Sequence, residues 1–296
     1  MESPETFDER VNASLDRIAP AQQRVARFIR ENREEVLIAS ASALAAKAGT
    51  SDATVVRTAK ALGFSGMDEL RRALAAELRD NLSPATRLAR TLSDVGDDLE
   101  AAFHVTLDIH QKALESLRRD ITPGHFRTAA QYIVDARRVF IFGIGPSSAM
   151  ADYFTIQLGR FGIEAHSLTQ TGLLLADGLQ RLREGDLLMI FAYSRVYREL
   201  VALLDQADRR GVTSILFTDT LGSKLRDRVD VVLSVARGRA DMLSMHTATL
   251  GLIEALLVGI ATKRPHETMA SLKSLNELRT ALVGEPMDLP AAMRDA

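Results

Sequence analysis

A turn rich in glycine and serine, Gly143-Ile144-Gly145-Pro146-Ser147-Ser148, has the residue types and spacing of an anion-binding site. It follows the apolar run Val139 to Phe142, which predicts a buried strand, and it precedes a segment that predicts a helix. The two glycines permit a tight turn, and Pro146 suits the first turn of a helix. Because serine hydroxyls and exposed amides at a helix N-terminus bind anions, a phosphate group is the expected guest. The predicted effector-binding residues of this turn are Gly143, Gly145, Ser147 and Ser148.

Two other interpretations of the same turn stay open. A dinucleotide site would have glycine in place of Ser148 and an acid at the end of the second strand, whereas Glu164 lies at the beginning of that strand. An ordinary strand-to-helix turn without any ligand would have the same local sequence. We expect no cofactor at this turn.

Catalytic and metal-binding residues are harder to find. Isomerisation of a sugar phosphate needs a base beside the substrate carbons, and His246 and Glu254 on a late helix are available for it. A lone histidine or carboxylate on such a helix is more often a structural partner. The remaining histidines show no paired ligand spacing, and the chain has no cysteine. We therefore expect neither a catalytic residue nor a metal site.

A second segment with functional character lies nearer the N-terminus. The alanine-rich run Ser42 to Ala48 predicts a short helix, and Gly49 supplies the left-handed residue that ends it. Ser51 then caps a second helix, which runs to Leu62 before Gly63 stops it. A short helix, a glycine turn and a capped second helix form a helix-turn-helix.

The spacing on the second of these helices divides its residues between two sides. Those predicted to be buried are Val55, Val56, Ala59 and Leu62, and those predicted to lie outward are Thr54, Arg57, Thr58 and Lys60. Arginine binds a guanine edge with two hydrogen bonds, threonine contacts bases, and lysine pairs with phosphate. The predicted DNA-binding residues are Thr50, Ser51, Thr54, Arg57 and Lys60. A plain helical hairpin with a solvated polar face is the alternative.

The elements that must position these residues fall into an all-α part and an α/β part. We expect a helix-turn-helix domain over 1–80, a linker with a connecting helix over 81–124, an α/β domain over 125–265 and a C-terminal tail over 266–296. The runs that predict strands are Val139 to Phe142, Ile163 to Leu168, Leu187 to Phe191, Ser214 to Phe217 and Val229 to Val235. Because helices alternate with them, the predicted fold is a parallel five-stranded sheet with helices on both faces. Ligands of such sheets bind beyond the carboxyl ends of the strands, here after Phe142 and Phe191.

Overall composition and the apolar stretches of the chain limit its possible partners and its location in the cell. With 37 basic and 39 acidic residues the formal net charge is −2, so overall charge does not indicate a nucleic-acid partner. The acidic start, Met1 to Arg10, is not a signal peptide. The apolar stretch Met242 to Thr262 is interrupted by His246 and Glu254, which favours a buried helix over a membrane span. We expect a cytoplasmic protein.

The helix-turn-helix segment also resembles a known family. The run from Ala45 to Gly66, with its Ala53-Thr54-Val55-Val56-Arg57 and Leu62-Gly63-Phe64-Ser65-Gly66 elements, is similar to the signature of the RpiR family of bacterial transcriptional regulators. This resemblance implies a homodimer or homotetramer that binds a double-stranded DNA operator. It also implies that the second domain is a sugar isomerase, or SIS, domain, and His125 to Lys263 resembles such domains throughout.

One loop departs from the family pattern. In SIS domains the loop after the third strand usually carries serines, a glycine and a threonine that close around a phosphate. Here it reads Phe191-Ala192-Tyr193-Ser194-Arg195-Val196-Tyr197, which keeps Ser194 but has Ala192, Arg195 and Tyr197 at the other positions. From this loop we add three predicted effector-binding residues, Tyr193, Ser194 and Arg195. Arg195 either recruits an acidic ligand or fills the pocket.

The sequence thus predicts a DNA-binding transcriptional regulator whose SIS-type domain senses a small anionic metabolite, with a sugar phosphate as the leading candidate. The alternative is a sugar-phosphate isomerase or a related SIS enzyme. The helix-turn-helix argues against that alternative, because a stand-alone isomerase has no use for it.

Overall fold

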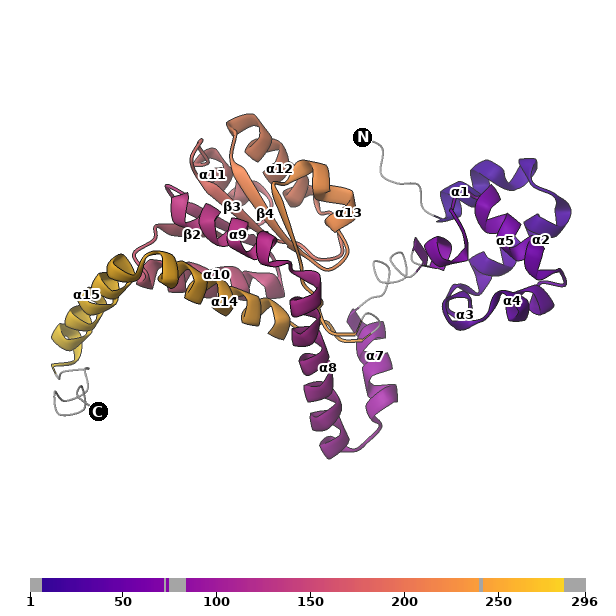
Figure 1. Ribbon diagram of the computed structural model, residues 1–296, viewed down its shortest axis with the longest axis horizontal. Coiled ribbons are helices and arrows are strands. Elements are labelled where there is room, and N and C mark those ends of the chain that lie inside the picture. Colours follow the sequence, from indigo (N-terminus) through magenta and orange to yellow (C-terminus); the bar gives the residue numbers. More distant parts are fainter. Residues whose placement is uncertain (1–6, 72, 75–83, 240–241, 285–296) are drawn as a thin grey trace. The chain divides into compact units, whose positions relative to one another are not determined.

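The computed structural model of the chain describes residues 7–71, 73–74, 84–239 and 242–284, and it divides between Thr91 and Leu92 into two compact units (Figure 1). The domain boundary expected at residues 80 and 81 lies outside the described residues, as does the end of the expected tail, 285–296.

The first unit is a small helical domain. Its elements are α1 (Phe7–Ser14), η1 (Leu15–Arg17), α2 (Pro20–Glu31), α3 (Arg33–Ile38), α4 (Ala41–Lys47) and α5 (Asp52–Ala61). Its core is a single cluster of side chains that includes Phe7, Val11, Val25, Ile29, Leu44, Val55, Ala59, Leu70 and Leu74. The helix α5 packs against both α2 and α4, so this core holds it in place.

The turn between α4 and α5 has the expected helix-turn-helix form. Ser40 caps α4 by accepting a hydrogen bond from the Ala43 amide at 3.2 Å, and Ser51 caps α5 by accepting one from the Thr54 amide at 3.3 Å. Between the two helices Gly49 has a φ of +62°, a conformation that side chains with a Cβ rarely adopt. The predicted all-α helix-turn-helix domain is therefore confirmed.

Two helices connect the domains along the chain. The first, α7 (Pro84–Val95), spans the division between the units, and the second, α8 (Leu99–Asp120), belongs to the second unit. The connecting helix expected from about residue 97 to 119 is α8. Asp98 caps it by accepting a hydrogen bond from the Glu100 amide at 2.8 Å.

The second unit is built on a parallel five-stranded sheet, as predicted. Its strands are β1 (Val139–Gly143), β2 (Ala165–Leu168), β3 (Leu187–Phe191), β4 (Thr213–Thr218) and β5 (Val231–Ser234), in the order β2-β1-β3-β4-β5. All neighbouring pairs are parallel. The strands β1 and β3 are completely buried because helices cover both faces of the sheet.

The helices form a layer on each side of this sheet. The remaining elements are α9 (Pro123–Asp135), α10 (Pro146–Arg160), α11 (Leu173–Gln180), α12 (Arg198–Arg210), α13 (Gly222–Leu225), η2 (Arg226–Arg228), α14 (Thr247–Lys263) and α15 (Pro265–Val283). One face packs its apolar side chains against α9, α10 and α14, and the other packs them against α11, α12 and α13. The segment expected to be a tail therefore contains the helix α15.

The apolar stretch near the C-terminus is a core helix. Seven residues of α14 are buried, from Ala248 to Ile260, and all of them except Thr249 belong to the larger hydrophobic cluster. Among the described residues no helix is both long and apolar enough to cross a membrane.

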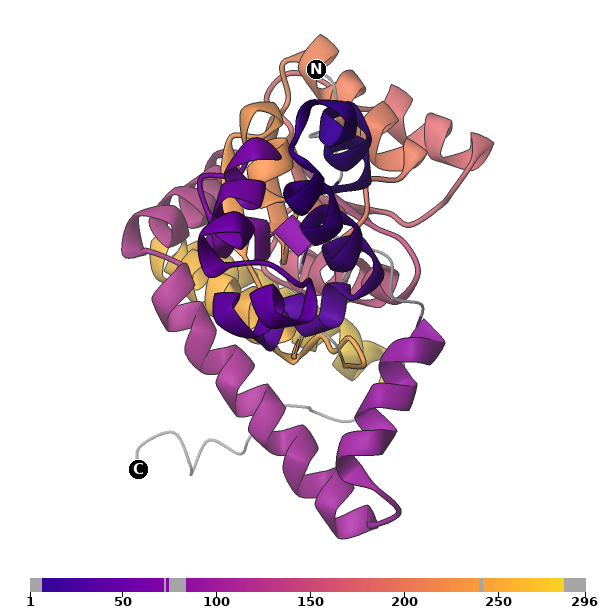
Figure 2. The ribbon, with the colours of Figure 1, turned by 90° about the vertical axis from the view of Figure 1, so that its right-hand side faces the viewer.

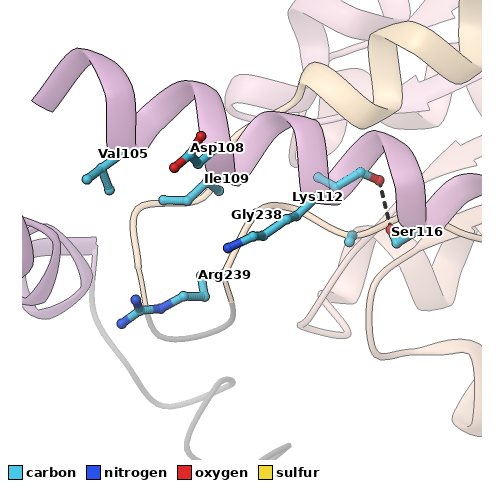
Figure 3. A pocket seen from close by; sticks show the side chains of 9 residues that line it. Val105, Asp108, Ile109, Lys112, Ser116, Gly238 and Arg239 are labelled. Atoms are coloured by element: carbon cyan, nitrogen blue, oxygen red, sulfur yellow. Dashed lines mark hydrogen bonds between the residues drawn. The ribbon is translucent and has the colours of Figure 1, made fainter. Parts of the chain in front are cut away.

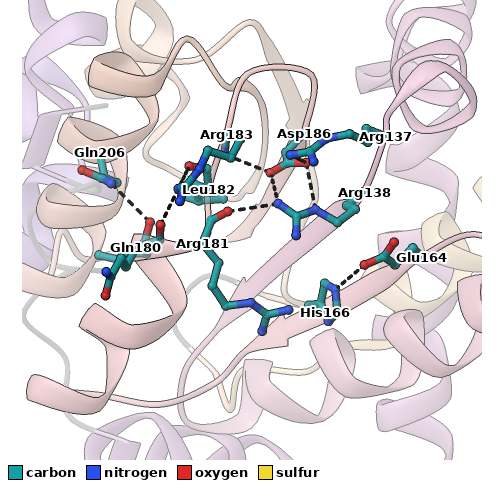
Figure 4. A network of polar contacts seen from close by, with 11 residues as sticks. Arg137, Arg138, Glu164, His166, Gln180, Arg181, Leu182, Arg183, Asp186 and Gln206 are labelled. Carbon is teal, nitrogen blue, oxygen red and sulfur yellow. Dashed lines mark hydrogen bonds and ion pairs between the residues drawn. The ribbon is translucent and has the colours of Figure 1, made fainter.

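A buried carboxylate joins the amino ends of the neighbouring strands β1 and β3 (Figure 4). The side chain of Asp186, which precedes β3, is fully buried and accepts two hydrogen bonds from the guanidinium of Arg138, at 3.1 and 2.8 Å. It also lies 2.9 Å from a guanidinium nitrogen of Arg137 and accepts a hydrogen bond from the Arg183 amide at 2.9 Å. The pKa of Arg138 is raised, mainly by its hydrogen bond to Asp186. This network fixes the start of β1 relative to the start of β3.

Candidate DNA-binding face and effector site

The outward face of α5 differs from the one predicted. Thr54 and Thr58 were expected to point outward, yet they are only 8 % and 0 % exposed, whereas Val56 was expected to be buried and is 36 % exposed. Hydrogen bonds explain the buried threonines. The Thr58 hydroxyl donates to the Thr54 carbonyl at 2.7 Å, so its polar group is satisfied inside the domain. The predicted facing of these three residues is wrong.

The exposed residues of α5 form a stripe along one side of the helix. They are Asp52, Ala53, Val56, Arg57, Lys60 and Ala61. The Arg57 guanidinium lies back along the helix, where its Nε donates to the Ala53 carbonyl at 3.2 Å. The stripe combines one larger apolar side chain, three that are small or acidic, and two cationic ones, and apolar and cationic side chains are the kinds that contact base edges and phosphates.

The other two predicted DNA-binding residues lie at the start of α5. Thr50 is half-buried in the turn, and the Ser51 hydroxyl is already engaged as the cap of the helix. The Ser51 hydroxyl also lies 3.0 Å from that of Thr54. The five predicted residues are therefore spread from the turn before α5 to its last turn, and among those on the helix only Arg57 and Lys60 have exposed side chains.

In the second unit, the predicted anion-binding turn leads directly from β1 into α10. A Cβ added to Gly143 would lie 2.5 Å from the Ser147 carbonyl oxygen, so only glycine fits there. Gly145, with φ 59° and ψ −136°, is the N-cap of α10 and offers no side chain to the first amides of the helix. Gly172 begins α11 in nearly the same conformation, with φ 59° and ψ −140°. The first amides of α10 therefore have no side-chain cap, as an anion site requires.

The strand order places a second loop beside this turn. Gly143, the last residue of β1, is paired with Phe191, the last residue of β3, so both loops leave the sheet at the same edge. In the sheet, β2 lies on one side of β1 and β3 lies on the other, so the order of the strands reverses between β1 and β3. The carboxyl ends of these two strands are therefore the topological switch point of the sheet. Crevices at such points are where open parallel sheets bind their ligands.

The three predicted residues of the second loop have different surroundings. Tyr193 is buried, and its hydroxyl lies 2.7 Å from that of Thr249 on α14. The Tyr193 carbonyl accepts hydrogen bonds from the hydroxyls of Thr218 and Thr220 at 3.0 and 3.2 Å. Ser194 is half-buried and Arg195 is exposed. Tyr193 therefore anchors the loop in the core, and the outer part of the loop is presented by Ser194 and Arg195.

Behind this loop lies a polar cluster that the sequence does not predict. The Arg237 guanidinium lies 4.5 Å from the centre of the Tyr193 ring and 3.2 Å from Nε2 of His246, and the two rings are 5.4 Å apart. Burial, and then the positive charge of Arg237, lowers the pKa of His246 to about 4. Burial also raises the pKa of Tyr193 to about 12. Arg237 could not have been found from spacing, because its contact with Tyr193 joins segments that are far apart in the sequence.

A cavity of about 420 Å³ lies apart from the predicted residues, between α8 and the segment that follows β5 (Figure 3). It is lined by Val105, Asp108, Ile109, Lys112, Ala113, Ser116, Ala236, Gly238 and Arg239. Arg239 is held there by an ion pair with Asp94 at 2.7 Å. The cavity contains none of the residues predicted to bind an effector.

Comparison with protein families assigns both parts of the chain. Residues 6–81 match the model of the helix-turn-helix domain of the rpiR family, and residues 132–259 match that of the SIS domain. An uncharacterized HTH-type transcriptional regulator of Caldanaerobacter subterraneus is 25 % identical over 88 % of this chain and 92 % of its own length. The bifunctional protein glk of Burkholderia orbicola is 28 % identical, but this chain covers only 40 % of its length.

Solved structures agree with this division. The sugar isomerase domain of an RpiR transcription factor from Sphaerobacter thermophilus is 28 % identical, with a TM-score of 0.53 over 57 % of this chain and 94 % of that one. The Vibrio vulnificus NanR protein, complexed with ManNAc-6P, has a TM-score of 0.59 and 23 % identity over 94 % of this chain and 99 % of its own. With an rpiR-family helix-turn-helix domain followed by a SIS domain, the chain belongs to the RpiR family of transcriptional regulators.

Proposed function

We propose that this regulator binds an operator in double-stranded DNA through the exposed stripe of α5, as a homodimer or homotetramer in the cytoplasm, and that a sugar phosphate controls it. The phosphate binds at the start of α10, within the turn from Gly143 to Ser148. The observation that carries this proposal is the uncapped amino end of α10 at the topological switch point, beside the loop of Ser194 and Arg195. The complex of the similarly folded NanR with ManNAc-6P supports the choice of ligand class.

Arg195 fits recruitment of an anion better than obstruction of the site. A side chain that plugs a pocket must be buried in it, whereas Arg195 is exposed. A guanidinium at the rim of a phosphate site forms paired, charge-assisted hydrogen bonds with an anionic ligand. Arg195→Gly should therefore weaken effector binding by about 1.5 to 3 kcal/mol.

Isothermal titration with ManNAc-6-phosphate, the same sugar without phosphate, and inorganic phosphate tests the site. Ser148→Asp is the sharpest variant, because an acid in the first turn stabilises the helix while it repels a bound phosphate. We expect Ser148→Asp to fold normally and to lose the phosphosugar, and Ser148→Ala to retain most of the binding. Undiminished binding by Ser148→Asp would exclude this turn as the anion site.

An isomerase is the alternative function. Its two available bases are already engaged elsewhere, since Nε2 of His246 contacts Arg237 and Glu254 accepts a hydrogen bond from the Tyr153 hydroxyl at 3.2 Å. We propose that the chain does not interconvert the sugars it binds. Proton NMR of a sugar phosphate incubated with the protein would reveal isomerisation, and turnover would favour the enzyme.

A further inference from the structure

The first half of α8 is only weakly packed. From Leu99 to Asp108 the helix contains no buried residue, and its buried residues, Ala113 and Ser116, lie in the second half, where α8 packs against α14. Figure 2 shows these first turns of α8 projecting from the body of helices and strands. Short helices are only marginally stable in water without tertiary contacts. This half of α8 therefore needs a surface to pack against.

The exposed side of α8 is apolar. Leu99 is 87 % exposed, Phe103 61 %, Leu107 50 % and Leu114 40 %. Because these residues are spaced by four, four and seven positions, they lie on one side of the helix. We call these four residues the α8 stripe. Single exposed apolar residues are ordinary, but an aligned set of this size marks an interaction surface.

The charges along α8 indicate what covers the stripe. Asp97 and Asp98 directly precede the helix and Glu100 lies in its first turn, whereas in its second half the three basic residues Lys112, Arg118 and Arg119 outnumber the acidic Glu115 and Asp120. Two copies of the helix that ran side by side in the same direction would place like charges together. Two antiparallel copies place the acidic start of each against the basic end of the other, and a surface that complements itself in this way suits a two-fold axis.

We propose that the α8 stripe is the contact between two copies of this chain, which pair their α8 helices antiparallel about a two-fold axis. The proposal deepens the homo-oligomer of the proposed function by locating its interface. Leu107 lies near the middle of the stripe and so next to the axis, while Leu99 of one copy faces Leu114 of the other. The charged groups at the two ends set the antiparallel direction.

Disulfide trapping tests the direction of pairing, because the chain has no native cysteine. In the full-length protein under mild oxidation, Leu107→Cys should form a covalent dimer. Leu99→Cys alone should not, but a mixture of Leu99→Cys and Leu114→Cys proteins should. Ala101→Cys, which is two residues from Phe103 and so faces away from the stripe, is the matched control. Crosslinking of Leu99→Cys to itself, without crosslinking in the mixture, would show parallel pairing and overturn the proposal.

Charge insertion tests the location of the contact independently. Phe103→Glu buries a carboxylate in the contact and should raise the dimer dissociation constant at least about 100-fold, and Leu107→Glu should do the same. Ala101→Glu adds the same charge on the opposite side and should leave the dimer intact. Circular dichroism and analytical ultracentrifugation report folding and assembly.

The possible outcomes distinguish a wrong location of the interface from a wrong oligomeric state. If Phe103→Glu and Leu107→Glu proteins remain dimeric, the contact lies elsewhere and only this inference fails. If the unmodified chain is monomeric at micromolar concentration, as it would be if its own helix-turn-helix domain covered the stripe, the proposed homo-oligomer fails as well.

Discussion

At the scale of single residues, the exposed side chains of Arg57 and Val56 determine which base edges α5 is suited to contact. The side chains of both are exposed, whereas those of Thr54 and Thr58 are turned into the domain. An arginine on this face suits a guanine, and a valine suits the methyl group of a thymine. The candidate reading surface is thus less polar than the sequence alone predicts.

Arg57→Ala should weaken binding to the specific operator by about 1 to 3 kcal/mol if Arg57 contacts a base, while the fold stays intact. Lys60→Ala should instead weaken binding to all sequences alike and reduce its salt dependence. Fluorescence anisotropy with an operator selected in vitro and with a scrambled duplex measures both effects. A folded Arg57→Ala protein with unchanged discrimination would remove Arg57 from the reading surface.

His246 should make the stability of the second unit depend on pH. Its pKa falls from 6.5 in the unfolded chain to about 4 in the folded one, because burial and Arg237 disfavour the imidazolium. The unfolded chain therefore binds more protons between these values, so stability is fully present above pH 6.5 and is lost as the pH falls toward 4. Since His246 is only partly buried, solvent screening reduces the expected loss to about 1 to 2 kcal/mol.

Urea unfolding at pH 7.5 and pH 4.5 measures this loss. Carboxylates also titrate in this range, so the comparison is with His246→Asn, which cannot titrate. The variant should lose less stability than the native chain between the two pH values. Equal losses would mean that His246 is not held in its neutral form.

Among the elements, β1 and β3 owe their alignment to Asp186. Asp186→Ala should cost about 3 to 5 kcal/mol, because it leaves two arginine side chains without their buried carboxylate. The matched control is Asp208→Ala, which removes one exposed partner of Arg228 while Asp205 remains at 2.8 Å. The control should change stability by less than about 1 kcal/mol. Chemical denaturation of the two variants gives the comparison, and similar losses in both would refute a special role for Asp186.

The elements were more predictable than the directions of their side chains. Apolar runs bounded by glycine indicate buried parallel strands, and all five were found within about two residues of their predicted ends. The facing of Val56 and Thr58 could not be predicted, since threonine is buried at no cost in polar contacts when it bonds to its own helix. Arg237 and Tyr193 meet only through the tertiary fold, so no local pattern indicates their contact. The same holds for the pairing of Asp186 with Arg138, 48 residues apart.

For the whole molecule, control of DNA binding requires that the effector favour one arrangement of the DNA-binding domains over another. A two-fold pairing through α8 implies that the operator is an inverted repeat, with one half-site for each chain. Binding to both half-sites at once raises the effective concentration of the second domain.

Phe103→Glu should therefore bind an isolated half-site as tightly as the native chain does, but it should lose the extra affinity for the full operator. A decrease of at least about tenfold in the ratio of full-site to half-site affinity is expected. Electrophoretic mobility shifts on the two duplexes measure that ratio. A variant that kept its full-site advantage would show that cooperation between the DNA-binding domains does not depend on α8.

The backbone angles of the glycines that precede α10 and α11 favour a residue of D-configuration over one of L-configuration. Gly145 and Gly172 both have φ 59°, with ψ −136° and −140°, and no atom lies within 4 Å of a Cβ added to either. Handedness rather than space therefore excludes other residues, because these angles mirror those of an ordinary extended residue. A D-alanine introduced by chemical ligation at Gly145 would adopt them without strain and restrict the unfolded chain, whereas L-alanine would strain the turn. The two enantiomers should thus shift the melting temperature in opposite directions.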